Sequence, residues 1–176
     1  MEVQNGNKTF VVTGDGAGSK APRHYYGADV QLQKKHGWGR TELRGEYWTG
    51  KQPGTAATTV NPGTLPLGPT YIRNFDGAFF YFLQNIINTK WDLAVKYDWY
   101  DPNTDVAGKE LGQQGTNLTG ADVKFSTLGF GVTRYLNANL KVVLYYDWVQ
   151  NETTGLSSYT NDIKDNVLTC RLQFAF

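Results

Sequence analysis

The sequence is poor in cysteine and methionine, has almost no net charge and lacks any long apolar run. Its one cysteine, Cys170, excludes an intramolecular disulfide. Lys and Arg number 17 against 16 Asp and Glu, so the formal charge is +1 and the basic excess of most nucleic-acid-binding proteins is missing. No run of about 18 apolar residues occurs, which excludes a transmembrane helix. A membrane-spanning strand is still compatible with the sequence, because it needs only about 9–11 residues with every second one apolar.

The start of the chain lacks the pattern of a signal peptide. Residues Met1 to Asn5 have neither a basic start nor an apolar centre. We therefore expect either that a signal has been removed or that the sequence is a piece of a longer chain.

Aromatic residues, in contrast, are abundant at 14%, although the mean hydropathy is only −0.47. This combination suits strands with one face toward lipid and one toward water, because the two faces cancel in the average. None of the 6 prolines interrupts a segment that alternates with a period of two. Such segments predict strands at about 25–33, 39–49, 72–85, 90–100, 122–135, 139–150 and 165–176.

The connections between these segments alternate in length. Short turns are expected at 34–38, 86–89 and 136–138, and long loops rich in Gly, Pro, Thr and Asn at 50–71, 101–121 and 151–164. This segregation is typical of an outer-membrane meander with tight periplasmic turns and long extracellular loops. We therefore predict an all-β fold, an antiparallel transmembrane β-barrel over 25–176, with 1–24 as an extracellular loop or a weak first strand.

The predicted strands separate into an apolar and a polar face. On 90–100, Leu93 and Val95 lie between Trp91 and Trp99, and aromatic rings in such positions favour the membrane interface. An exterior stripe of a soluble barrel, or the core of a sandwich, is the alternative. The predicted lipid-interface aromatics are Tyr26, Trp91, Tyr97, Trp99, Tyr146, Trp148, Phe174 and Phe176.

Strand 39–49 places four charged side chains on one face, which could not point into hydrocarbon without a large desolvation cost. We expect them to line a channel and to set its ion preference. The alternatives are a salt-bridged plug in a narrow barrel, or solvated charge without selectivity. The predicted channel-lining residues are Asp29, Arg40, Glu42, Arg44, Glu46, Lys96, Asp98, Lys141, Tyr145, Asp147 and Arg171.

Two of the expected strands alternate less clearly. Residues 75–83 are apolar on both faces, so their inward side chains are expected to meet other protein. Strand 122–135 alternates well only around Phe130 and leaves Arg134 on the apolar face near a turn, where it could extend to lipid headgroups.

The last strand has apolar side chains at every second position up to Phe176. This pattern resembles the C-terminal signal that the outer-membrane barrel assembly machinery recognises. Cys170 falls among the lipid-facing positions, where it acts as a small hydrophobic residue and not as a nucleophile.

Four segments resemble the C-terminal part of Bacteroidetes-type porins, similar to the phosphate-selective porin O and P family. They are Tyr25-Tyr-Gly-Ala-Asp-Val-Gln, Thr41-Glu-Leu-Arg-Gly-Glu-Tyr-Trp-Thr-Gly, Phe79-Phe-Tyr-Phe-Leu-Gln-Asn and Lys96-Tyr-Asp-Trp-Tyr-Asp-Pro-Asn. The resemblance implies a bacterial outer-membrane porin, a passive diffusion channel for ions and small hydrophilic solutes, anions among them. In larger members it implies a homotrimer of barrels with about sixteen strands. Phosphate selectivity does not transfer, since the expected channel wall mixes both signs of charge.

Strand parity suggests a fragment of a larger barrel. If Phe176 lies on the periplasmic side, counting back along the strands makes 25–33 run from the cell exterior toward the periplasm. Residues 1–24 would then be an extracellular loop, and the strands that precede it in the barrel would be missing from the sequence. The alternative is that Asn7–Gly14 supplies an eighth strand and closes a small barrel, which would have a structural or adhesive role through its loops.

No catalytic, cofactor or metal site is expected, and the chain is not predicted to be an enzyme. Asp101–Asp105 begins like a calcium loop but has Val106 at the turn position that needs glycine. Gly14–Gly18 is not followed by the Lys-Ser/Thr of a phosphate loop. His24 and His36 are expected at opposite ends of a strand. The expected partners are outer-membrane lipid and the barrel assembly machinery, with no nucleic acid.

Overall fold

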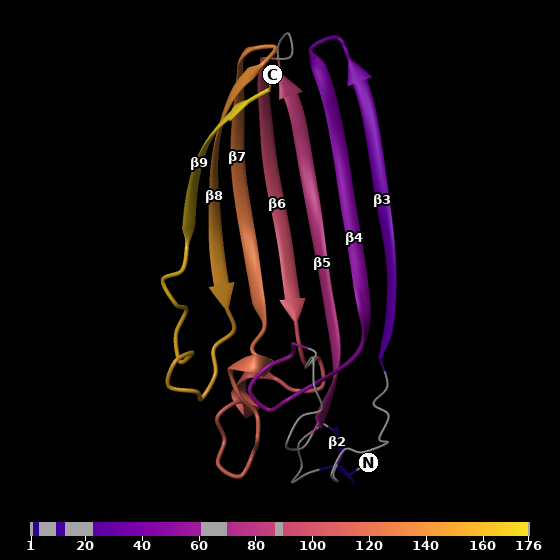
Figure 1. The fold of residues 1–176 in the computed structure, drawn as a ribbon, viewed down its shortest axis with the longest axis vertical. Helices are drawn as coiled ribbons and strands as arrows, with labels where there is room; N and C mark the ends of the chain where they lie inside the picture. Colours follow the sequence, from indigo (N-terminus) through magenta and orange to yellow (C-terminus); the bar gives the residue numbers. More distant parts are fainter. Residues whose placement is uncertain (1, 4–9, 13–22, 61–69, 87–89, 176) are drawn as a thin grey trace.

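The computed structural model describes residues 2–3, 10–12, 23–60, 70–86 and 90–175. It is an all-β protein whose main element is an antiparallel sheet of 7 long strands (Figure 1). The strands are β3 His24–His36, β4 Gly39–Gly54, β5 Thr70–Ile86, β6 Trp91–Asp101, β7 Phe125–Asn137, β8 Leu140–Asn151 and β9 Val167–Phe174. Every long strand predicted from the alternation is confirmed, with shifted ends.

Two of the shifted ends have a clear physical cause. β4 continues to Gly54, so Pro53 lies inside a strand, against the expectation that no proline does. It is tolerated because it pairs with Ile72 at the very end of the ladder. β7 begins at Phe125 and not at residue 122, because Gly120–Asp122 forms a 3-10 turn, η2, whose N-cap Thr119 accepts a hydrogen bond from the Ala121 backbone N–H (3.1 Å).

The long strands form a meander in which each one pairs with the next in the chain. Two short strands, β1 Glu2–Val3 and β2 Phe10–Val12, lie at the loop end, where β2 pairs with residues 70–72 of β5. The described part of Asn7–Gly14 therefore extends neither edge of the sheet, contrary to its proposed role as an eighth barrel strand. The remaining residues of that segment lie outside the described part of the chain.

Over the described residues, the short turns and the long loops are segregated as predicted. The turns that follow β3 and β7 lie at one end of the sheet, called the turn end, and the long connections lie at the other, the loop end (Figure 1). The short turn at 87–89 lies outside the described residues. The β6–β7 loop also contains the 3-10 turn η1, Gly108–Glu110.

The sheet is not closed on itself in the structure. β3 pairs only with β4, and β9 only with β8, so both are edge strands over the described part of the chain. Both also run from the loop end to the turn end (Figure 1). The structure therefore shows an open antiparallel sheet, and not the closed barrel expected from the sequence.

A small core at the loop end holds the long loops together. Leu111, Leu118 and Val123 are buried, and Tyr159 from the β8–β9 loop packs against them. Beneath them the fully buried Arg73 of β5 pairs with Asp122, its Nε lying 2.6 Å from Oδ1. No helix within the described ranges has the length and apolar character needed to cross a membrane.

The Arg73–Asp122 pair joins three parts of the chain. Arg73 Nη1 donates to the Thr55 carbonyl after β4 (2.9 Å), while Asp122 accepts from Asn103 Nδ2 (2.8 Å) and from the Thr119 backbone N–H (2.9 Å). Because each charge is surrounded by hydrogen-bonding partners, the pair can stay buried.

Candidate functional site: the polar face of the sheet

The pairing register assigns every residue of the sheet to one of two faces, because directly opposed residues lie on the same side. Asp29 opposes Glu46, and Arg44, Tyr81 and Lys96 form one row across β4, β5 and β6. We call this side the polar face. It contains all the residues predicted to line a channel: Asp29, Arg40, Glu42, Arg44, Glu46, Lys96, Asp98, Lys141, Tyr145, Asp147 and Arg171.

The opposite side, which we call the apolar face, carries a broad layer of exposed hydrophobic side chains, with a few polar residues such as Thr41 and Gln84 toward the turn end. One row runs from Leu43 through Phe82 and Val95 to Phe130, and Phe82 and Phe130 are 42% and 47% exposed. Nothing described covers this layer, although soluble monomers rarely expose so large an apolar patch. It contains the predicted interface aromatics Tyr26, Trp91, Tyr97, Trp99, Tyr146, Trp148 and Phe174; Phe176 lies outside the described residues.

Aromatic rings at both ends of the apolar face have polar partners. Toward the loop end, Trp99 Nε1 donates to Asp76 Oδ1 (3.1 Å). Toward the turn end, the Arg134 guanidinium lies over the Trp91 ring, 4.4 Å from its centroid. Such amphipathic pairs suit the boundary between hydrocarbon and water.

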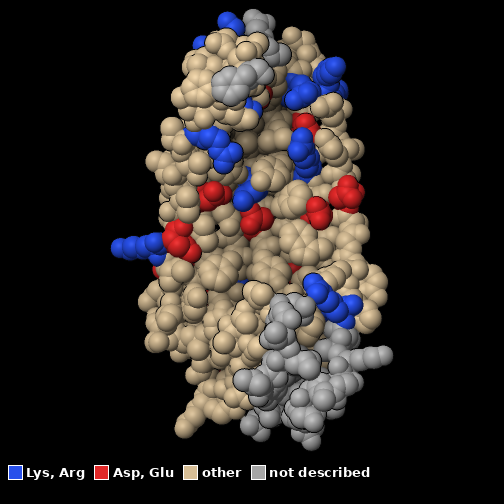
Figure 2. Space-filling view, in the orientation of Figure 1, with Lys and Arg blue, Asp and Glu red and all other residues tan. Residues whose placement is uncertain are grey.

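Charges on the polar face are layered along the strands. Asp29, Glu46 and Asp98 lie in one row, whereas Lys35 opposes Arg40 in a row nearer the turn end. Figure 2 shows the result: acidic side chains form a band across the middle of this view, and most basic ones gather between that band and the turn end.

Some of these charges neutralise one another locally. Lys96 Nζ lies 2.7 Å from Asp98 Oδ2 and 3.6 Å from Asp147 Oδ1, and buried Glu42 pairs with Arg44. Gln31 Nε2 also donates to Glu42. A second set has no ion pair anywhere in the described ranges: Asp29, Lys35, Arg40, Glu46 and Arg171. The face therefore retains charges that can act on a solute.

A hollow of about 520 Å³ lies at the turn end of the polar face, lined by Lys35, Arg40 and Asp92 among others. Asp92 is already hydrogen-bonded by neutral groups, Asn85 Nδ2 (2.7 Å) and the Tyr135 hydroxyl (2.8 Å). Neither Lys35 nor Arg40 forms an ion pair with Asp92 in the described part of the chain, so two cations face the hollow against one carboxylate.

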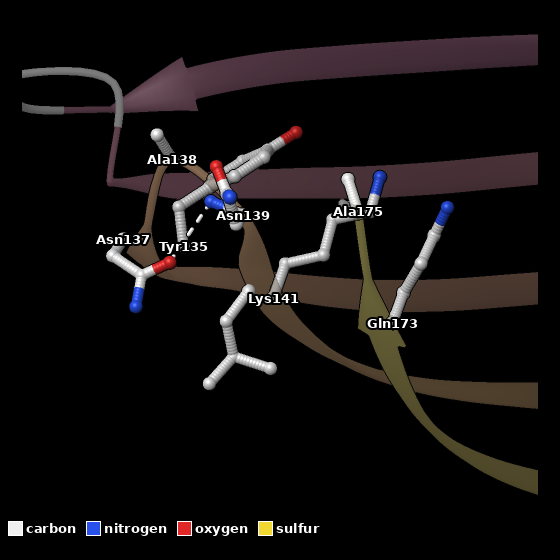
Figure 3. Close-up of a pocket in the computed structure, with 8 residues that line it drawn as sticks. Tyr135, Asn137, Ala138, Asn139, Lys141, Gln173 and Ala175 are labelled. Atoms are coloured by element: carbon white, nitrogen blue, oxygen red, sulfur yellow. Dashed lines mark hydrogen bonds between the residues drawn. The ribbon is translucent and has the colours of Figure 1, made fainter.

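A smaller pocket of about 160 Å³ lies beside the β7–β8 turn (Figure 3). The Asn139 backbone N–H donates to Asn137 Oδ1 (2.9 Å), and the Asn139 carbonyl accepts from the Ala175 N–H (2.9 Å). These bonds attach the end of β9 to the turn. Lys141 is the only charged side chain among the described residues that line the pocket. The pocket is therefore best explained by the packing of the β9 end against the turn.

The side chain of Tyr145, one of the predicted lining residues, lies flat against β7. A Cβ on Gly129 or Gly131 would come within 2.3 and 2.4 Å of the Tyr145 side chain, so the two glycines make room for its ring. Sequence reasoning missed this packing, although two glycines at alternate positions of a strand were the signal. The aromatic side chains that β5 adds to the polar face agree with the apolar character expected on both sides of 75–83, and Phe79 and Tyr81 are only half-buried among the described residues.

Within the described part of the chain, no group of three or more His, Cys, Asp or Glu side chains is arranged to hold a metal ion. In the loops, burial raises the pKa of the Glu152 carboxyl above its ordinary value, although the Lys124 backbone N–H donates to it (2.9 Å).

Comparison with protein-family models, with curated proteins and with solved structures found no match. Function is therefore inferred from the two faces of the sheet.

Proposed function

We propose that this sheet is part of the wall of a bacterial outer-membrane β-barrel that forms a porin, a pore for passive diffusion of ions and small hydrophilic solutes. One observation supports the proposal above the others: over the described residues, the same strands present an uncovered apolar layer on one side and, on the other, charges of both signs that form no ion pair. Lipid is the natural solvent for the first side and water for the second.

The dimensions of the strands support a membrane location. β6 has 11 residues, β8 has 12 and β5 has 17, and a transmembrane strand needs about 9–11. The aromatic side chains with polar partners lie near the two ends of these strands, as the aromatic girdles of such barrels do.

The topology favours a barrel larger than this sheet. β3 and β9 run in the same direction, so antiparallel closure between them requires an odd number of further strands. Eight strands enclose an interior just wide enough to be filled by side chains. The unpaired charges on the polar face would be costly in such a filled interior and are hydrated in a wider one.

The direct test is single-channel conductance of the full-length gene product in planar lipid bilayers. We expect discrete, passive conductance steps in simple salt solution. A folded, inserted protein that gives no current would overturn the pore and would favour a small, closed barrel with a structural or adhesive role.

The layered charges predict how ion preference can be changed. The double variant Lys35→Glu/Arg40→Glu places two negative charges where two cations face the turn-end hollow, so the permeability ratio should shift roughly severalfold toward cations. The matched variant Asp29→Asn/Glu46→Gln removes negative charge from the acidic row and should shift the ratio toward anions. Reversal potentials in a salt gradient measure both, and ratios equal to that of the unmodified protein would remove these residues from the pore lining.

A further inference from the structure

A column of aromatic side chains runs along β5 on the polar face. Phe75, Phe79 and Tyr81 occupy alternate positions on this side, and the gap at Gly77 is covered by the indole of Trp48 from β4. A Cβ on Gly77 would lie only 2.7 Å from Trp48 Cζ2, so glycine is what allows the ring to lie flat there.

The rings form a continuous surface. The Trp48 and Phe79 ring centroids are 6.3 Å apart, and those of Phe79 and Tyr81 are 5.7 Å apart. At the loop end, buried Phe75 packs between Tyr25 (5.3 Å) and Tyr100 (6.1 Å). The loop-end part is thus a packed base, whereas Trp48, Phe79 and Tyr81 are only half-buried and present ring surface to the polar side.

Hydrophilic groups flank the half-buried rings on both sides. Phe79 lies in one row with Glu46 on β4 and Asp98 on β6, and Tyr81 lies in the next row between Arg44 and Lys96. Within the described residues, Glu46 makes no hydrogen bond or ion pair through its side chain. The rings are therefore bordered by groups that can accept or donate hydrogen bonds to a solute.

Simple diffusion of ions does not require such a surface. Apolar rings on a wet wall are unfavourable by about 25 cal/mol for each Å² that stays exposed, and nothing described covers them. A solute that stacks on the rings removes that penalty. It must also carry a rim of uncharged hydrogen-bonding groups, because the flanking charges are of both signs and would repel part of any strongly charged ligand.

Carbohydrate combines these two properties, since a sugar ring has an apolar C–H face and a rim of hydroxyls. We propose that Trp48, Phe79 and Tyr81 form a stacking track for a neutral linear oligosaccharide, with Glu46, Asp98 and Arg44 hydrogen-bonding its hydroxyls. The inference rests on the proposed function, because it places the track on the wall of the pore and makes an oligosaccharide one of its solutes.

The test adds sugars to the conducting full-length protein in a planar bilayer. The probes are a linear α-1,4-linked glucose hexasaccharide and a β-1,4-linked one, with a polyethylene glycol of the same size as a non-stacking control. At least one sugar should interrupt the ion current at concentrations at which polyethylene glycol does not. If neither sugar blocks more than polyethylene glycol, the track is not a carbohydrate site.

Two neighbouring phenylalanines provide a matched pair of variants. Phe79→Leu removes a ring from the polar face and should weaken the sugar block roughly three- to tenfold. Phe80→Leu makes the same change on the apolar face of β5 and should leave the block unchanged. Equal block in Phe79→Leu and the unmodified protein would also overturn the track.

Failure of the pore and failure of the track can be told apart. Ion current without sugar block rejects the track and keeps the pore. If no current appears, calorimetric titration of the detergent-folded protein with the same sugars still tests the track: binding that is weakened by Phe79→Leu supports it, and no binding rejects it.

Discussion

Lysine in place of Val95 is expected to destabilise the protein folded in a lipid bilayer, lowering its free energy of unfolding by about 2–4 kcal/mol. This is the cost of a cation near the middle of a barrel's lipid face. Val95 lies in the apolar row between Phe82 and Phe130, midway between Trp91 and Trp99. Under the proposed function the side chain at this position faces hydrocarbon, so a lysine there would lose most of its hydration. Urea titration of protein folded into liposomes measures the change.

The matched control for this prediction is Ala94→Lys. Ala94 is the preceding residue, on the polar face, where a lysine can extend into water. We expect its folding free energy to change by about 0.5 kcal/mol or less. Equal losses in the two variants would show that the apolar face does not contact lipid.

Replacing Arg73 by methionine is expected to cost about 3–5 kcal/mol, because it leaves the Asp122 carboxylate buried without its counter-charge. The pair connects β5 to the residues after β4 and to the β6–β7 loop, so the loss should appear first as easier cleavage of the 102–124 loop in limited proteolysis. Chemical denaturation of the folded protein measures the size of the effect.

Two further variants give this prediction its controls. Lys124→Met breaks a longer, more exposed ion pair with Asp101 (3.8 Å) and should cost less than about 1 kcal/mol. The double variant Arg73→Met/Asp122→Leu removes both buried charges, so its cost should be smaller than the sum of the two single losses. Similar costs for Arg73→Met and Lys124→Met would mean that the buried pair does not hold the loops.

The strands and the composition of their faces could be predicted because both depend on local alternation. Side chains point to opposite sides with a period of two. Alternation from Trp91 to Trp99 therefore determines the face of each residue before any partner strand is known. The long loops were equally visible, since Gly and Pro cluster between the alternating segments.

The rest depends on contacts between residues far apart in the chain. Arg73 and Asp122 are 49 positions apart, and no local pattern links them. The aromatic column became visible only when the register placed Trp48 over Gly77. The position of Pro53 within β4 was likewise unpredictable, because a proline at the last rungs of a ladder leaves no trace in the alternation.

The outer edge of β9, which is unpaired over the described part of the chain, has a consequence for biogenesis. Its outer backbone N–H and C=O groups are a ready template for the next strand, whether this is supplied by the same polypeptide or, transiently, by an insertion factor that adds a strand of its own. In water the same edge would promote aggregation. Under the proposed function, β9 is thus the strand at which the barrel closes. Pairing of its free edge completes the barrel and removes the edge that would promote aggregation.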